Sequence, residues 1–175
     1  SGFAAYALWR LSEAAGGGLF VNGNLTLESS IIQGNKTDAD VDGSHINAEG
    51  GGILVHGALT MTDSLVDGNH CDTNASAYSH YFYSRGGGIW SDGPLTITRS
   101  AITGNTAYDY AGLLSLGSGA AHDRVITNST IAANQSTRAP AGIYAVALLV
   151  LDNSTVAFNT ASLPADDGDA GIRAL

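Results

Sequence analysis

The sequence predicts an all-β fold: a right-handed parallel β-helix of about five coils over residues 16–175, with a short N-terminal cap over residues 1–15. Three observations lead to this prediction. A glycine followed by an aliphatic residue recurs along the chain, a serine and an asparagine five residues apart follow it, and apolar and polar residues alternate around that serine. One short unit is thus repeated along the chain, which is the sequence signature of a solenoid.

The glycine–aliphatic pair marks the start of each repeat. It occurs at Gly18-Leu19, Gly52-Ile53, Gly88-Ile89, Gly112-Leu113, Gly142-Ile143 and Gly171-Ile172. The serines and asparagines that follow the first five pairs are Ser30 and Asn35, Ser64 and Asn69, Ser100 and Asn105, Ser129 and Asn134, and Ser154 and Asn159. The glycine-to-serine distance is twelve residues in four repeats and seventeen in the repeat that begins at Gly112, where Gly117 begins an insertion.

Alternation at period two indicates strands with one buried face. The apolar residues three positions before the serines are Leu27, Met61, Ile97, Ile126 and Leu151, and those two positions after them are Ile32, Val66, Ile102, Ile131 and Val156. A single coil cannot bury these side chains, but coils stacked about 4.8 Å apart pair every strand in parallel with its copies. We therefore expect two interior columns, in a helix that is right-handed like most parallel crossovers.

The five asparagines mark one turn of every coil. A side-chain amide is both a donor and an acceptor, so stacked asparagines can bond to one another and to the backbone of the turn. The constant spacing therefore predicts an asparagine ladder along the solenoid.

The repeat at Gly86 to Asn105, GGGIWSDGPLTITRSAITGN, resembles that of right-handed β-helix proteins on bacterial surfaces. These include polymorphic outer-membrane proteins and autotransporter-like adhesins. The resemblance covers residues 16–172 and implies an extracellular or cell-surface structural and binding module, as a surface adhesin or a fibre subunit. The same solenoid also carries pectate lyases and other polysaccharide-active enzymes, so a lyase or hydrolase is the alternative.

The charge balance excludes two classes of partner. Sixteen acidic residues stand against seven basic ones, for a net charge of −9, which suits neither nucleic acid nor anionic lipid. The longest apolar run, residues 141–151, is too short for a membrane-spanning helix, which needs about 20 residues. Cys71 is the one cysteine, and no motif places a base beside it, which indicates an ordinary structural side chain.

A cation-binding pattern lies in residues 36–49, a long segment that we expect to be a loop. The sequence from Asp38 to Glu49 matches D-x-[DN]-x-[DN]-G-x5-E, the calcium-loop pattern, in which alternating carboxylates converge on one hard cation. The predicted calcium ligands are Asp38, Asp40, Asp42, Ser44 and Glu49. No helices flank this pattern as they do in an EF-hand, and the alternative is an acidic, solvated loop.

Two groups of apolar residues are candidate binding surfaces for a protein or carbohydrate partner. The second long segment, residues 70–85, is also expected to be a loop and carries Tyr78, Tyr81, Phe82 and Tyr83. A column two residues after the opening glycines is expected to point outward: Phe20, Leu54, Trp90, Leu114 and Tyr144. Exposed apolar groups of this size mark contact surfaces. The alternative for both is that they are covered by the chain itself.

No catalytic residue is assigned. Hydrolysis of a glycosidic bond needs two carboxylates in one cleft, and no spacing in the sequence demands one. Asp63, Asp67 and Arg99 lie near the same corner of adjacent coils, where a solvated ion pair is the simpler interpretation. Binding is therefore expected rather than catalysis.

The N-terminal segment has two interpretations. Residues 2–15 are rich in helix formers and are expected to form a short amphipathic helix that plugs the first coil. An extended half-coil is the alternative, because Gly2 to Leu11 echoes Gly142 to Leu151.

The last glycine–aliphatic pair reopens the repeat and is expected to place Ile172 beneath Ile143. A bare terminal coil exposes backbone groups and apolar core, which invites association. We therefore expect this face to be occupied, by further chain or by the N-terminal segment of a neighbouring copy in a head-to-tail filament. Phe3, Trp9 and Leu11 would cover the face in the second case.

Overall fold

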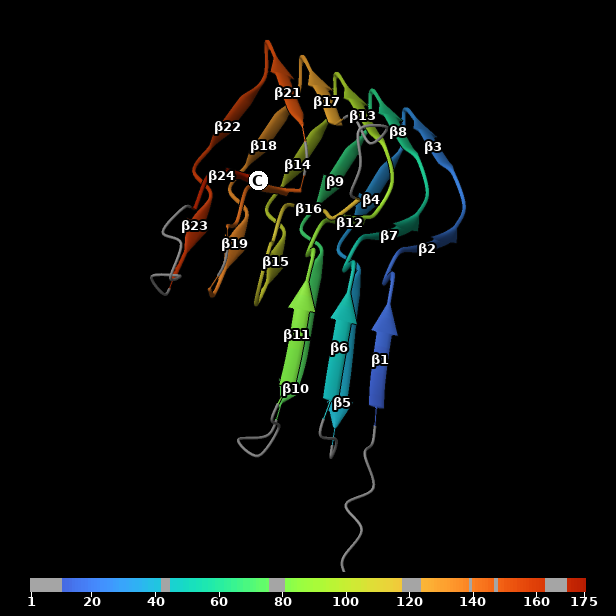
Figure 1. Ribbon diagram of the computed structural model, residues 1–175, viewed down its shortest axis with the longest axis vertical. Helices are drawn as coiled ribbons and strands as arrows, with labels where there is room; N and C mark the ends of the chain where they lie inside the picture. The colour runs from blue at the N-terminus through green and yellow to red at the C-terminus, as the bar shows by residue number, and fades with distance from the viewer. Residues whose placement is uncertain are drawn as a thin grey trace, which may run out of the picture.

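The computed structural model describes residues 11–41, 45–75, 81–117, 124–138, 140–146, 148–162 and 170–175. Every regular element in these residues is a β-strand, and all the strand pairings are parallel (Figure 1). The predicted all-β fold of stacked parallel strands is confirmed, and the arrangement is consistent with a parallel β-solenoid. No helix long and apolar enough to cross a membrane occurs in the described part of the chain.

The strands form five sheets, each named after its first strand in the chain. The β2 sheet contains β2 (Leu19–Asn22), β7 (Ile53–His56), β12 (Ile89–Ser91), β16 (Leu113–Ser115), β20 (Ile143–Ala145) and β24 (Ile172–Ala174). The β3 sheet contains β3 (Leu25–Glu28), β8 (Leu59–Thr62), β13 (Leu95–Thr98), β17 (Arg124–Thr127) and β21 (Leu149–Asp152). The β4 sheet contains β4 (Ile31–Gln33), β9 (Leu65–Asp67), β14 (Ala101–Thr103), β18 (Thr130–Ala132) and β22 (Thr155–Ala157).

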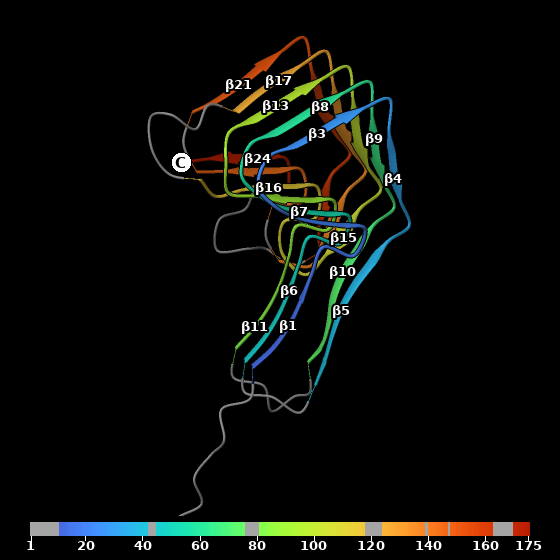
Figure 2. The same ribbon diagram turned by 90° about the vertical axis from the view of Figure 1, so that its right-hand side faces the viewer.

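The remaining two sheets lie beside one another below the others in Figure 2. The β5 sheet contains β5 (Lys36–Val41), β10 (His70–Ala75), β15 (Thr106–Ala107), β19 (Gln135–Ser136) and β23 (Thr160–Ala161). The β1 sheet contains β1 (Leu11–Ala15), β6 (His45–Glu49) and β11 (Tyr81–Arg85). The chain therefore passes through the β2, β3, β4 and β5 sheets in the same order in successive repeats, and the strands of the β1 sheet precede only β2, β7 and β12.

Both predicted interior columns are confirmed by the strand register. The first runs Leu27, Met61, Ile97, Ile126, Leu151, and the second runs Ile32, Val66, Ile102, Ile131, Val156. Met61, Ile97 and Ile126 are fully buried, whereas Leu151 on the last repeat is 36% exposed. Each buried aliphatic side chain stabilises the fold by roughly 1.5–3 kcal/mol.

One interior position breaks the apolar pattern. Arg124 pairs in register with Leu95 on one side and Leu149 on the other, and it is fully buried. Its guanidinium donates to Ser115 Oγ at 2.6 Å and to the Gly117 carbonyl at 2.5 Å. Burial lowers the pKa of this guanidinium. The buried Arg124 side chain thus connects Gly117, where the insertion begins, to the core by a hydrogen bond.

Glycine is required where successive repeats approach most closely. A Cβ added at Gly51 would lie 2.5 Å from the Gly87 carbonyl oxygen and 2.6 Å from the His70 carbonyl carbon. Atoms at that distance overlap, so no side chain fits without moving backbone. The glycine triplets that open the early repeats are therefore a packing requirement as well as a turn signal.

The asparagine ladder is present as predicted. Nδ2 of Asn69 donates to Oδ1 of Asn105 at 3.0 Å, and Nδ2 of Asn105 donates to Oδ1 of Asn134 at 2.9 Å. The backbone N–H of each asparagine donates to the same Oδ1. These three side chains are fully buried, so the ladder satisfies polar groups that would otherwise be costly to bury.

The two long segments after Asn35 and Asn69 are strands, so the expectation of loops is wrong for their described parts. β5 pairs with β10 and β6 pairs with β11, and together with β1 they form a two-sheet extension from the first repeats (Figures 1 and 2). Small buried side chains line its interior: Ala39, Ala48 and Cys71. These let the two sheets pack closely, which is why the segments fold as strands despite their polar sequence.

The N-terminal segment also differs from expectation. Residues 11–15 are strand β1, which pairs in parallel with β6 from Leu11↔His45 to Ala15↔Glu49. A helix over residues 11–15 is therefore wrong, because these residues extend along the edge of β6; the half-coil over Gly2 to Leu11 stays a prediction. Residues 2–10 lie outside the described residues.

Candidate functional site

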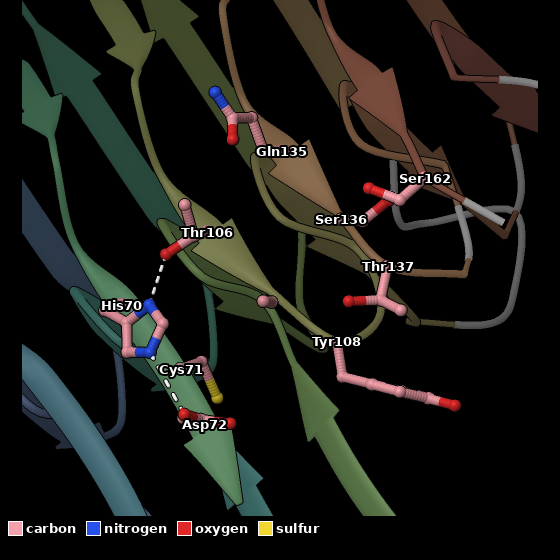
Figure 3. Close-up of a pocket in the computed structure, with 10 residues that line it drawn as sticks. His70, Cys71, Asp72, Thr106, Tyr108, Gln135, Ser136, Thr137 and Ser162 are labelled. Carbon is pink, nitrogen blue, oxygen red and sulfur yellow. Dashed lines mark hydrogen bonds and ion pairs between the residues drawn. The ribbon is translucent and has the colours of Figure 1, made fainter.

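A polar groove lies on the outer face of the β5 sheet, and its volume is about 310 Å³ (Figure 3). It crosses several strands and takes side chains from four successive repeats. Its lining residues are His70, Cys71, Asp72, Thr106, Ala107, Tyr108, Gln135, Ser136, Thr137 and Ser162. We call this feature the polar groove.

Strand alternation decides which side chains reach the polar groove. Cys71, Ala107 and Ser136 are buried and face the interior, while the residue before each of them faces outward. Those outward residues are in register across the sheet: Lys36, His70, Thr106, Gln135 and Thr160. The result is a row of polar side chains at the strand spacing of about 4.8 Å.

His70 is the centre of the hydrogen bonding in the groove. Its Nδ1 bonds to the Thr106 hydroxyl, and its Nε2 lies 3.3 Å from a carboxylate oxygen of Asp72. One neutral tautomer serves both contacts, with Nε2–H donating to Asp72 and Nδ1 accepting from Thr106. The other carboxylate oxygen of Asp72 accepts from the Thr73 N–H at 2.8 Å. The imidazole is therefore held in place while 42% of its side chain stays exposed.

Tyr108 contributes an aromatic side chain to the groove, and Figure 3 shows it near Thr137. The Arg138 guanidinium lies 5.4 Å from its ring centroid. Arg138 also donates to both carboxylate oxygens of Asp109, at 3.2 and 2.9 Å. This bidentate pairing raises the pKa of Arg138, and it neutralises the charge of the buried Asp109.

Cys71 lines the floor of the polar groove, but its environment makes the thiol unreactive. Its side chain is 1% exposed, and burial raises the pKa of its thiol to about 12. A thiol with this pKa is neutral and a poor nucleophile near pH 7. The prediction that Cys71 is a structural residue agrees with this environment.

The predicted calcium ligands are spread over two sheets. Asp38 and Asp40 lie on β5, Glu49 ends β6, and Asp42 and Ser44 lie outside the described residues. The Asp38 carboxylate pairs with Lys36 Nζ at 2.7 Å. Among the described residues no group of three or more His, Cys, Asp or Glu side chains is placed to hold a metal ion. Calcium binding stays a prediction.

The predicted outward column is mostly covered. Leu54, Trp90 and Leu114 are buried and form a cluster with Tyr110, Leu116 and Tyr144 packed against it. The expectation of an exposed ladder is therefore wrong for these three residues, and the alternative of a covered strip is the one observed. Phe20 at the first repeat is the exposed member, at 56%.

The aromatic residues of the second long segment do not form a described cluster. Tyr81, Phe82 and Tyr83 begin strand β11, and Tyr78 lies outside the described residues. The Tyr83 ring is half-buried beneath the Arg85 guanidinium, 3.8 Å from its centroid. Their role as a binding surface stays a prediction.

The charged cluster at the serine corner is an exposed ion pair. Arg99 donates to both carboxylate oxygens of Asp63 at 2.7 Å, which lowers the pKa of Asp63. Asp67 instead accepts from Gln33 and Thr103. The three charged residues therefore do not converge on one cleft.

Two of the four residues predicted for assembly, Leu11 and Ile172, lie in the described part of the chain. Ile172 pairs in register with Ile143, as predicted, and it is 37% exposed. Leu11 begins β1, whereas Phe3 and Trp9 lie outside the described residues.

Sequence reasoning missed the polar groove, although a signal was present. The residue directly after each ladder asparagine is polar in all five repeats, from Lys36 to Thr160. That regularity marks an outward polar row once the asparagines are stacked. Comparison of the chain with protein-family models, with curated proteins and with solved structures found no match.

Proposed function

We propose that this chain is an extracellular structural and binding module, a right-handed β-helix of about five coils whose polar groove binds a neutral carbohydrate chain. The proposal joins the bacterial-surface resemblance of the repeat to a feature of the fold. The single observation that carries it is the register of His70, Thr106 and Gln135 on adjacent strands.

A row of donors and acceptors at a regular spacing suits a linear polymer with repeated hydroxyl groups. Thr106, Gln135 and Thr137 offer hydroxyl and amide groups, and Tyr108 offers a ring face. The strands that carry them are held in one register by the sheet, so the row is preorganised. Binding to such a row loses little free energy to ordering of the protein.

The charges around the groove favour a neutral ligand. Lys36 pairs with Asp38, and Arg138 pairs with Asp109, so both cations near the row are already neutralised. Asp72 adds a negative charge, and the whole chain carries a net charge of −9. An acidic polysaccharide would therefore be repelled, whereas an uncharged one would not.

The described lining of the groove supports binding more than hydrolysis. Asp72 is its one carboxylate among the described residues, while glycoside hydrolysis uses two facing carboxylates. A polysaccharide-active enzyme is the alternative, and turnover of a polysaccharide that is lost in Asp72→Asn would establish it.

Calcium is part of the proposal as a stabiliser of the segment from Asp38 to Glu49. Calorimetry with calcium on the native chain and on Asp40→Ala tests it. A calcium response that is equal in both proteins contradicts the site.

The test of the carbohydrate proposal is a binding screen against immobilised neutral and acidic polysaccharides, followed by titration with a soluble fragment. Gln135→Ala and Tyr108→Ala should each weaken binding roughly two- to tenfold, the effect of losing about one hydrogen bond or ring contact. Thr96→Ala is the matched control, because Thr96 is exposed on β13 in a different sheet. Equal binding by all three variants, or preference for acidic polysaccharides, would overturn the proposal.

A further inference from the structure

Six asparagines of this chain stand in N-x-S/T sequons, the acceptor sequence for N-linked glycans. They are Asn24, Asn35, Asn74, Asn128, Asn134 and Asn153. A glycan is bonded to the side-chain amide nitrogen and is bulky, so its asparagine belongs on the surface. The fold gives these asparagines unequal surroundings, because Asn35 and Asn134 are also members of the buried ladder. In those two sequons one side chain has two incompatible roles.

The Asn134 side chain uses every hydrogen-bonding group that it has. Its Nδ2 donates to the Ile102 carbonyl at 3.0 Å and to Asn159 Oδ1 at 2.9 Å. Its Oδ1 accepts from the N–H and the Nδ2 of Asn105, at 3.0 and 2.9 Å. A glycosylated amide keeps a single N–H, so a glycan on Nδ2 would remove one of the two hydrogen bonds that Asn134 donates.

The Asn134 amide nitrogen is also too closely packed to carry a sugar. The side chain is fully buried, and a Cβ added at Gly112 would lie 3.0 Å from Nδ2 and 2.5 Å from the Gly142 carbonyl oxygen. A position too crowded for one methyl group excludes a sugar ring. Asn35 is packed in the same way, since a Cβ added at Gly18 would lie 2.8 Å from its Nδ2.

The hydroxyl residue of the Asn134 sequon is inside the fold as well. Ser136 is 3% exposed and faces the interior, whereas Gln135 between it and Asn134 is exposed. A glycosyltransferase recognises both the asparagine and the hydroxyl residue of a sequon, and the folded strand hides both. Thr37, the hydroxyl residue of the Asn35 sequon, is likewise buried. Asn134 is therefore an acceptor only while the chain is unfolded.

Asn128, six residues earlier in the same repeat, has the opposite surroundings. It is exposed at a corner, with a left-handed backbone of φ +51° that asparagine tolerates. Its Oδ1 accepts from Asn153 Nδ2, while its own Nδ2 donates to no described residue. Thr130, the hydroxyl residue of this sequon, is exposed as well. A glycan on Asn128 would extend into solvent and leave both the ladder and the core intact.

From these observations we infer that folding and N-glycosylation compete for this chain: Asn128 is a glycan acceptor of the folded protein, whereas a glycan on Asn134 prevents folding. In both cases the amide nitrogen bonds to C1 of a sugar, the C1–O bond to a diphosphate carrier breaks, and the amide releases one proton. The chain consequently folds in a compartment where no N-glycosyltransferase meets it unfolded. The inference does not rest on carbohydrate binding by the polar groove.

The order of folding and glycosylation can be controlled to test this inference. The chain is made by cell-free synthesis, and a soluble N-glycosyltransferase with UDP-glucose is added either during synthesis or after folding. Mass spectrometry then locates glucose in the soluble and insoluble fractions. Added after folding, the enzyme should modify Asn128 and leave Asn134 unmodified. Present during synthesis, it should modify Asn134 too, but only in insoluble chain.

Three results of this experiment would overturn the inference. The first is soluble, folded protein that carries glucose on Asn134. The second is an Asn134 that stays unmodified in both fractions when the enzyme is present during synthesis. The third is an Asn128 that stays unmodified when the folded protein is treated.

Sequon variants separate the effect of the glycan from that of a substitution. Ser136→Ala and Thr37→Ala together remove both ladder sequons and keep their asparagines. Alanine suits this column, because the register neighbours of Ser136 are Ala107 and Ala161. The fraction of chain that stays soluble when the enzyme is present during synthesis should be severalfold higher in the double variant than in the native chain. Asn128→Gln is the control, which should be lost from the soluble fraction as the native chain is. Equal soluble fractions for the native chain and the double variant contradict the inference.

Discussion

Asn105 and Asn134 are joined by a buried hydrogen bond, from Nδ2 to Oδ1 at 2.9 Å, while the same Nδ2 also donates to the Val66 carbonyl at 3.1 Å. Asn105 Oδ1 in turn accepts from both the N–H and the Nδ2 of Asn69. One side chain thus connects three repeats. No other residue type of this size supplies two donors and an acceptor in that geometry.

Replacing Asn105 by alanine should therefore be strongly destabilising. It leaves the Asn69 N–H buried without a partner, a loss of about 1–3 kcal/mol, and it also removes the hydrogen bonds that the Asn105 Nδ2 donates to Asn134 Oδ1 and to the Val66 carbonyl. We expect the free energy of unfolding to fall by about 3 kcal/mol or more in denaturant titration. Asn24→Ala is the control, since Asn24 is exposed and accepts one hydrogen bond, from Ala58 N–H. A similar loss of unfolding free energy in both variants would mean that the buried ladder asparagine stabilises the fold no more than an exposed asparagine does.

Gly51→Ala should destabilise the fold through overlap rather than through lost hydrogen bonds. The added Cβ would meet backbone of both Gly87 and His70, and backbone shifts of this kind cost about 1–3 kcal/mol or more. Gly171→Ala serves for comparison, because no atom lies within 4 Å of a Cβ added there. Thermal unfolding of the two variants measures the difference. An unchanged melting temperature in Gly51→Ala would contradict the close approach of the repeats.

The solenoid was predictable because its signal is repeated. Leu27 and its equivalents stand at one fixed distance from a serine, and parallel stacking turns equal spacing into a column. The two-sheet extension was not predictable in the same way. β5 and β10 contain acidic and polar residues that resemble loops, and only the small residues Ala39 and Cys71 between them mark an inward face.

The buried column that contains Trp90 shows a second limit of predicting strand faces from the alternation of residues. Alternation correctly places Trp90 on the face opposite Ile89, but it cannot tell solvent from another layer of protein. Trp90 packs with Leu54 and Leu114, and Tyr110 and Tyr144 lie against this cluster. Leu54, Trp90, Leu114 and Tyr144 share one position of the repeat, whereas Tyr110 and Leu116, which also belong to this cluster, lie outside that column. The polar groove depends in the same way on neighbours brought together by stacking.

The Cys71 thiol gives a pH-dependent prediction. Burial raises its pKa to about 12, from an ordinary value of 9.0. Below pH 9 the thiol is neutral in both states, and above it only the unfolded chain ionises, so the free energy of unfolding should fall between about pH 9 and pH 12. Native protein at pH 8 should also resist thiol reagents until it is unfolded. In Cys71→Ala the free energy of unfolding should fall less steeply with pH above pH 9, because no thiol ionises in the unfolded chain. An identical slope in both proteins would contradict the burial of the Cys71 thiol.

The most direct test of the proposed binding function is to map which residues change their NMR signals when a ligand binds. Backbone amide chemical shifts are recorded by NMR while a neutral oligosaccharide that passes the binding screen is titrated into the native chain. We predict shifts concentrated at β10, β15, β19 and β23, around His70, Thr106 and Gln135. Amides of β8, β13 and β17 should stay unchanged. Shifts centred on that second sheet or on the end repeats, with none at Gln135, would contradict binding in the polar groove.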